Sequence, residues 1–524
     1  MNLDRMRRYA ETETVDVVVI GTGAGGAPLL ARLAAAGLTV VALEAGANRD
    51  PATEFVPDEA MSADLYWMNE RVSGGKTPEA FGANNSGVGV GGSTLHWGAF
   101  VPRADARDLR LKTETGKGED WPLSFSDLLP YYEEVERFIG VSGPANYPWD
   151  ADRRYPLPPV KRNAPAQAMI AGCEALGVKA SDGPVAVVSE PYAVGGIPAR
   201  VPCRNCGYCH QGCRNGAKTS MDVTYLPLGL GHGAEIRPNS FVHGFERDRQ
   251  GRITAVLYRQ GEVEKRQRCA AVFLCAGAVE TPRLLLVNDL ANSSGQVGRN
   301  YTAHVATQVW GTFDKPMRMN KGYPSAIITE DMVRPKDADF AGGYLVQSLG
   351  VVLQTWSDQV ARGRGLWGRD LVRYLDRYNW TAGIGINGES LPSEENRLTL
   401  SDEKDATGLP KPLIRYSEGE NEARLKRHAV AFMRQVWEAA GASDIWVLER
   451  TAHTIGTCRM GTDPDRAVVD PFGRSFDTPN LWICDNSVFP SSLAANPALT
   501  IMALSLRAAD RFLDRAAPTA VGQA

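Results

Sequence analysis

The 524-residue chain lacks the long apolar run that a membrane-spanning helix needs. Such a helix takes roughly 20 consecutive apolar residues, and the best candidate, residues 27–43, is interrupted by Arg32. The N-terminus also lacks the apolar core of a secretory signal, because Glu11 and Glu13 follow its early arginines. We therefore expect no transmembrane segment and no signal peptide of the chain's own.

A strong excess of charge is missing as well. Lysine and arginine together number 57 and aspartate and glutamate 61, which gives a formal net charge of −4. Without a basic field the chain has no general attraction for nucleic acid. Apolar residues make up 43% of the sequence, as in ordinary globular proteins, and the length indicates two or three domains.

Residues 15–20 form a β-branched run that ends at a glycine-rich turn, and they predict a buried parallel strand. The turn contains Gly21, Gly23 and Gly26, which let backbone amides and a helix N-terminus approach a pyrophosphate. A second strand follows the helix and ends before Glu44, whose carboxylate can accept ribose hydroxyls. No arginine follows Glu44 to hold a 2′-phosphate. The pattern therefore predicts a dinucleotide site, argues against NADP and is compatible with FAD.

Further motifs rich in glycine, histidine or proline recur along the chain. They are residues 87–98, 274–285, 297–300, 453–461, 481–490 and 495–500. Together with the first turn they resemble the glucose-methanol-choline (GMC) family of FAD oxidoreductases over most of the chain. Within the family the chain is most similar to the flavoprotein subunits of bacterial FAD-dependent glucose, gluconate and glucoside dehydrogenases. Those carry an Asp-Trp-Pro motif, here residues 120–122, and a Glu-x-x-Pro-x-x-x-Asn-Arg segment, here residues 389–397.

The resemblance implies roles for individual residues. His453 matches the family's catalytic histidine, which takes the hydroxyl proton, and Asn496 matches the group that holds the substrate oxygen while hydride passes to the flavin. The cofactor contacts that it implies beyond the first turn and Glu44 are Gly91, Gly92, Ser93, His96, Asp485, Asn496 and Pro497. His96 occupies the position where some relatives attach FAD covalently and others do not, so both forms of attachment stay open.

Four of the nine cysteines fall within eleven residues, as Cys203-x-x-Cys206-x-x-Cys209-x-x-x-Cys213. This spacing matches runs that bind iron–sulfur clusters, and a structural Zn²⁺ site or two disulfides are the alternatives. The resembled dehydrogenases hold a three-iron cluster on a C-x5-C-x3-C spacing, which Cys203, Cys209 and Cys213 satisfy. Cys206 departs from that pattern. The resemblance therefore favours a 3Fe-4S cluster and leaves open a 4Fe-4S cluster with Cys206 as a further ligand.

We expect an α/β fold, with a Rossmann-like FAD-binding domain of discontinuous segments and an inserted α+β substrate-binding domain, as in the GMC family. Residues 14–300 and 451–515 are expected to form the first domain, including the iron–sulfur segment 200–218. Residues 301–450, where the glycine motifs vanish, are expected to form the second. Residues 516–524 are expected to be a frayed tail.

The expected function is that of an FAD-dependent dehydrogenase that oxidises a hydroxyl of a sugar, glycoside or sugar acid. A cluster that carries single electrons would serve transfer from FAD to a one-electron acceptor such as a cytochrome c. One alternative is an oxygen-using alcohol or sterol oxidase whose cysteines bind a structural metal. Another is a non-catalytic, FAD-binding electron-transfer subunit, although the presence of both His453 and Asn496 speaks against it.

The resemblance also implies partner proteins. The resembled complexes contain a smaller subunit whose export signal carries the folded flavoprotein across the membrane. We therefore expect a small export or chaperone subunit, a cytochrome c electron acceptor and a periplasmic location by co-export. Without such a subunit the chain would stay in the cytoplasm.

Overall fold

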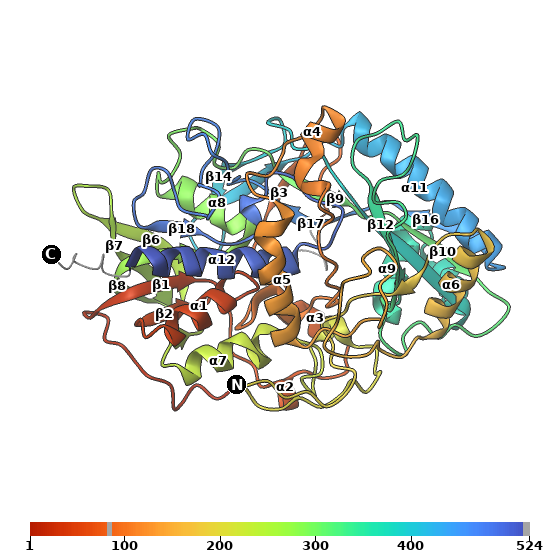
Figure 1. Ribbon diagram of the computed structural model, residues 1–524, viewed down its shortest axis with the longest axis horizontal. Coiled ribbons are helices and arrows are strands. Elements are labelled where there is room, and N and C mark those ends of the chain that lie inside the picture. Colours follow the sequence, from red (N-terminus) through yellow and green to blue (C-terminus); the bar gives the residue numbers. More distant parts are fainter. Residues whose placement is uncertain (81–85, 517–524) are drawn as a thin grey trace.

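A computed structural model of the protein describes residues 1–80 and 86–516 (Figure 1). The predicted tail, residues 516–524, lies almost entirely outside the described residues. Within them the strands form three sheets. No helix in the described part of the chain has both the length and the apolarity to cross a membrane.

The first sheet contains the strand, helix and strand predicted from residues 15–43. Its strand order is β5 (Glu235–Arg237), β2 (Val40–Leu43), β1 (Thr14–Ile20), β8 (Val263–Leu274), β7 (Ile253–Gln260) and β6 (Phe241–Arg247), with β18 (Leu481–Ile483) also paired to β8. β1 is parallel to both β2 and β8, as its β-branched and mostly buried sequence predicts. The carboxyl ends of these three strands therefore meet at one edge, where the glycine-rich turn begins.

Four helices pack together beside this sheet (Figure 1). They are α1 (Gly26–Ala35), α7 (Tyr225–Gly231), α12 (Ala498–Ala516) and α5 (Phe125–Ile139). The ends of α5 follow from its sequence, because Ser124 and Asp127 form a capping box at the start and Gly140 adopts a φ of 69° at the end. α1 packs against α7 and α12, and α12 packs against α5, so the C-terminal helix holds the first βαβ unit in place.

The second sheet is antiparallel. Its strand order is β16 (Ser443–Leu448), β10 (Gln308–Thr312), β13 (Thr381–Gly388), β12 (Tyr344–Leu349), β11 (Ile327–Thr329) and β4 (Ser181–Asp182), while β9 (Thr302–Val305) pairs with β13 and with β17 (Thr451–Ile455). Helices α6 (Ala164–Ala175) and α11 (Glu420–Ala439) pack on one face, where Val309 points. The next residue, Trp310, packs with Trp356 of α9 (Leu353–Arg364) on the opposite face. α9 covers only part of that face, so the remainder is open to a cavity.

A small third sheet and five further α-helices complete the described fold. The sheet consists of β14 (Arg397–Lys404), β15 (Pro410–Arg415) and β3 (Val72–Gly74). The helices are α2 (Pro51–Glu54), α3 (Met61–Leu65), α4 (Leu111–Thr115), α8 (Gly277–Val287) and α10 (Gly368–Leu375). The predicted fold class, a Rossmann-like sheet combined with a second layer of strands and helices, is confirmed. The domain boundaries at residues 300 and 450 stay a prediction; β4 and β17 lie outside them and still pair within the second sheet.

Candidate active site

A cavity of about 630 Å³ lies between the carboxyl edge of the first sheet and the open face of the second. This volume is in the range of small-molecule and cofactor sites, roughly 300–1,000 Å³. The predicted site residues that line it are Gly21, Gly23, Glu44, Gly92, Ser93, His96, His453, Asp485, Asn496 and Pro497. Gly26, Gly91 and the four clustered cysteines do not line it. The structure thus brings together residues from the beginning, middle and end of the chain.

Glycine is required at the positions of the first turn for different structural reasons. Gly21 has a φ of +94°, and a Cβ atom on Gly26 would lie 2.0 Å from the carbonyl oxygen of Gly21. A Cβ on Gly25, which the motif treats as variable, would lie 1.9 Å from the carbonyl oxygen of Cys484. Gly23 is different, because the nearest atom to its Cβ position is the Cα of Gly92, at 3.7 Å. Packing therefore explains three of these glycines, whereas Gly23 leaves a cradle open toward the cavity.

Glu44 directly follows β2 in the cavity wall, and both of its carboxylate oxygens accept hydrogen bonds from within the protein. Its Oε2 accepts hydrogen bonds from the amide (3.0 Å) and the hydroxyl (2.8 Å) of Thr22, and its Oε1 accepts from the amides of Gly46 (3.0 Å) and Gly89 (3.3 Å). Burial raises the pKa of the Glu44 carboxyl, and these hydrogen bonds oppose the shift. Glu44 thus ties the two glycine-rich segments together, and its contact with a ribose stays a prediction.

Asp485 and His96 also lie in the cavity wall. Asp485 accepts hydrogen bonds from the amide of Gly277 (2.8 Å) and the hydroxyl of Thr281 (2.6 Å) at the start of α8. The ring of His96 packs against that of Tyr66 in a tilted arrangement, with centroids 4.2 Å apart, and its Nε2 has no partner among the described residues. Burial, followed by the charge of Lys218, lowers the pKa of His96 well below its usual range. A neutral, unpartnered nitrogen is thus available beside the cavity, and the mode of FAD attachment stays a prediction.

The predicted catalytic histidine, His453, forms a pair with His304, which sequence reasoning missed. Their Nδ1 atoms are 2.9 Å apart, and Nε2 of His304 lies 2.9 Å from the carbonyl oxygens of both Ser492 and Leu493. Carbonyls only accept hydrogen bonds, so Nε2 of His304 carries a proton. Burial lowers the pKa of His304 to about 4, which keeps it neutral and leaves its Nδ1 as an acceptor.

This arrangement sets the protonation of His453. Because the acceptor is Nδ1 of His304, Nδ1 of His453 must donate. Burial, with further contributions from His304 and Arg450, lowers the pKa of His453 well below its usual range, so the ring is neutral. Its only proton is on Nδ1, and Nε2 is therefore free to accept a proton. The signal for His304 in the sequence was a histidine between Ala303 and Val305, in a chain with only seven histidines.

Asn496, the predicted partner of His453, is oriented by Asn387 of β13. The Nδ2 of Asn387 donates to the Oδ1 of Asn496 at 2.9 Å. The amide group of Asn496 therefore keeps its NH₂ available as a donor in the cavity. The cavity thus contains a proton acceptor on His453 and a hydrogen-bond donor on Asn496, the two functions needed to activate and hold a hydroxyl group.

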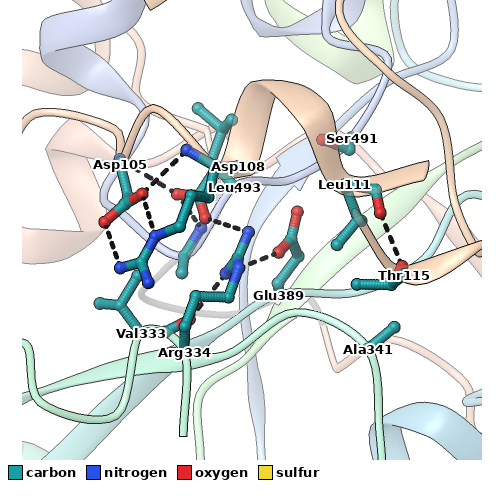
Figure 2. A network of polar contacts seen from close by, with 12 residues as sticks. Asp105, Asp108, Leu111, Thr115, Val333, Arg334, Ala341, Glu389, Ser491 and Leu493 are labelled. Atoms are coloured by element: carbon teal, nitrogen blue, oxygen red, sulfur yellow. Dashed lines mark hydrogen bonds and ion pairs between the residues drawn. The ribbon is translucent and has the colours of Figure 1, made fainter. Parts of the chain in front are cut away.

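A buried charge cluster lies near the loop that contains Ser491 and Leu493 (Figure 2). Arg334 is placed between Asp108 and Glu389, with ion-pair distances of 2.8 and 3.7 Å. Asp108 also accepts a hydrogen bond from the amide of Ala494 at 3.2 Å, one residue after the carbonyls that orient His304. Burial raises the pKa of Glu389 well above its usual range, with Asp108 adding to the shift. The Asp108–Arg334–Glu389 cluster thus supports the loop that positions the catalytic pair.

The four cysteines of residues 203–213 lie in one loop, and their thiols are free. Burial raises the pKa of Cys203 and of Cys209, which keeps both thiols protonated in the absence of a metal. Within residues 1–80 and 86–516, no three His, Cys, Asp or Glu side chains are arranged to hold a metal ion. The donor set has the thiolate chemistry of an iron–sulfur site, but its present arrangement does not form one.

Buried contacts join this cysteine loop to the cavity wall. The ammonium group of Lys218 donates to the carbonyl oxygens of Leu95 and Cys209, each at 2.7 Å. The ring of His210 is hydrogen-bonded through Nδ1 to the carbonyl oxygen of His96 at 2.8 Å. Hydrogen bonds therefore connect the cysteine loop to the segment that contains His96.

Comparison with known proteins identifies the family. Two family models described as GMC oxidoreductase match residues 73–306 and 392–505. The chain is 31% identical to the fructose dehydrogenase large subunit of Gluconobacter japonicus, over 96% of this chain and 98% of that protein. The chain belongs to the GMC oxidoreductase family. As a GMC oxidoreductase it is an FAD-dependent enzyme that acts on CH–OH groups.

Other GMC relatives differ in their named substrates. The chain is 30% identical to 2-methyl-1,2-propanediol dehydrogenase of Mycolicibacterium austroafricanum, over 96% of both chains. It is 27% identical to the gluconate 2-dehydrogenase flavoprotein of Pantoea cypripedii, over 94% of this chain and 93% of that protein. Among solved structures, pyridoxine 4-oxidase from Mesorbium loti aligns with a TM-score of 0.67 at 17% identity, covering 96% of this chain and 99% of that chain. This last likeness concerns the fold alone.

The residues of the cavity fit FAD. The cradle at Gly23, the fixed Glu44 carboxylate and the unpartnered nitrogen of His96 are the features that would hold it. Bound there, FAD supplies the acceptor for a hydride. His453 and Asn496 lie in the same cavity.

Proposed function

We propose that this GMC oxidoreductase is a dehydrogenase that oxidises a hydroxyl group of a sugar, glycoside or sugar acid. The observation that carries the proposal is the neutral His453, whose Nδ1 donates to His304 and whose Nε2 is free. Nε2 takes the proton of the substrate hydroxyl while the NH₂ of Asn496 holds the oxygen. Two of the relatives described above are named as dehydrogenases of a sugar or sugar acid.

We further propose that electrons leave through an iron–sulfur cluster held by Cys203, Cys209 and Cys213, with Cys206 as an optional fourth ligand. Support comes from the four thiols within one short loop and from the attachment of that loop to the cavity wall through Lys218. Such a cluster carries single electrons, as a cytochrome c acceptor requires. The ligand arrangement would have to form when iron binds.

Partner subunits belong to the same proposal. One relative is named as a large subunit, which indicates an assembly with other chains. We propose a small export subunit, a cytochrome c acceptor and a periplasmic location.

The test begins with protein purified without air and analysed for flavin, iron, sulfide and zinc. Hexoses, glycosides and aldonates are then supplied with a dye, with cytochrome c or with oxygen. We expect FAD, iron, reduction of the flavin by at least one sugar, and electron transfer to cytochrome c. Zinc without iron, together with rapid oxygen use, would instead support an oxidase with a structural metal site.

The cysteines are tested with a matched pair of variants. Cys209→Ser should abolish the cluster's paramagnetic signal and transfer to cytochrome c, while reduction of FAD by sugar continues. Cys269→Ser, at a buried cysteine of β8 outside the loop, should change neither. If Cys209→Ser transfers electrons to cytochrome c at the normal rate, the relay is wrong even though the dehydrogenase activity stands.

A further inference from the structure

Two glutamine side chains lie on the open face of the second sheet, on the two strands that flank β13. Gln308 of β10 and Gln347 of β12 are both paired with Gly385 of β13, one on each side. Residues that pair across a sheet point to the same face. The two glutamines therefore flank the glycine at a separation of two strand spacings, about 10 Å. Gln308, Gln347 and Gly385 all line the cavity.

Neither glutamine is satisfied within the protein. The Oε1 atoms of Gln308 and Gln347 are buried and have no hydrogen-bond partner among the described residues. Buried amides are normally paired, because an unmade hydrogen bond costs the desolvation of the polar group. Two such amides in the wall of one cavity indicate that a ligand completes their hydrogen bonds.

Gly385 lies between the two amides, and the side chains of Leu349 and Gln308 pack closely over it. A Cβ atom at this position would lie 2.8 Å from the Cδ1 of Leu349 and 3.2 Å from the Cγ of Gln308. Two residues further along β13, on the same face, Asn387 holds Asn496 by its hydrogen bond of 2.9 Å. The two glutamines therefore lie on the same face of the sheet as Asn387, the residue that orients Asn496.

We propose that Gln308 and Gln347, on either side of Gly385, form a subsite for the non-reacting hydroxyl groups of the substrate. This inference rests on the proposed function and adds to it the two residues that recognise the hydroxyls beside the carbinol that is oxidised. A primary amide both donates and accepts hydrogen bonds, and so does a hydroxyl group, so each glutamine can pair with one or two hydroxyls. A monohydric alcohol leaves both amides unpaired and is disfavoured for that reason.

The experiment compares two kinds of substrate. The best sugar from the dye screen is measured against cyclohexanol and 1-hexanol, which offer a single hydroxyl. Gln308→Leu and Gln347→Leu remove one amide each while keeping a side chain of similar bulk. Each should lower kcat/KM for the sugar about tenfold, mainly by raising KM, because one hydrogen bond is lost. The monohydric alcohols should be affected much less, so that the sugar preference falls.

Two further variants keep the result interpretable. Gly385→Ala places a Cβ 3.2 Å from the Cγ of Gln308, so it should displace that side chain and also raise KM for the sugar, with FAD content as the check on folding. Gln167→Leu, on the exposed side of α6, is the matched control and should leave both substrates as in the wild type. Equal losses for sugar and cyclohexanol, or none, in the Gln308 and Gln347 variants would overturn the subsite. If no sugar reduces the flavin of the wild type, the proposed function itself fails, and reduction by cyclohexanol alone would overturn both.

Discussion

His304 and His453 are 149 residues apart in sequence and form one functional unit in the structure. Two backbone carbonyls fix the proton on His304, and His304 fixes the proton on His453. The ring that faces the substrate therefore does not have to select its tautomer when substrate binds. His304 is a positioning residue, because it acts only through His453.

Replacing His304 tests this role. His304→Leu should lower kcat about 10- to 100-fold, as loss of an orienting partner typically does. Because His304 has a pKa of about 4 and is uncharged above pH 5, the loss should be similar at every pH from 5 to 9. Steady-state kinetics over this range provide the measurement, with FAD content as the control. His304→Gln, which can both donate and accept, should recover part of the rate; a wild-type kcat in the leucine variant would contradict the assignment.

At the scale of single elements, two glycines of the turn between β1 and α1 have different roles. Gly26 is needed for packing, and Gly23 is needed for cofactor binding. Gly23→Ala adds a Cβ whose nearest protein atom is 3.7 Å away, so the apoprotein should keep its melting temperature. The same Cβ occupies the cradle, and FAD affinity should fall at least tenfold. Gly26→Ala places its Cβ 2.0 Å from a carbonyl oxygen and should destabilise the apoprotein itself. Thermal unfolding and FAD titration of both apoproteins distinguish the two roles, and equal melting temperatures would contradict the packing argument.

Local elements such as this turn could be predicted from the sequence, because strand, glycines, helix and acid follow one another within 31 residues, from Thr14 to Glu44. The pairing of His304 with His453 could not, and neither could the contact of Asp108 with Arg334. Spacing along the chain does not encode contacts between distant segments. The glutamine subsite was missed for a related reason: it arises from the register of three antiparallel strands, which no local pattern specifies.

Across the whole molecule, the Asp108–Arg334–Glu389 cluster connects three distant parts of the chain. Burial raises the pKa of Glu389 in the folded state above its value in the unfolded chain, roughly 4.3. Between these two pKa values the folded protein binds more protons than the unfolded one. The free energy of unfolding should therefore fall as pH rises through this interval, by at most about 1.4 kcal/mol per pH unit for one group.

Glu389→Gln should remove this dependence, because the amide mimics the protonated carboxyl and does not ionise. The difference in melting temperature, variant minus wild type, should increase steadily from pH 5 to pH 9. Glu190→Gln, at an exposed position, serves as the control and should give a difference that does not change with pH. Parallel melting curves for Glu389→Gln and the wild type would show that Glu389 is ionised in the folded protein.

The backbone conformation at His453 limits which residues can replace this histidine. Its φ of +59° lies in the left-handed region, which histidine and asparagine tolerate better than alanine, and β-branched residues least of all. An alanine at this position would remove the imidazole and also strain the strand that presents it. An asparagine would remove the imidazole alone. The residues that can occupy position 453 are therefore restricted by backbone conformation as well as by chemistry. In a relative that has lost catalysis, we expect asparagine or glycine to replace the histidine.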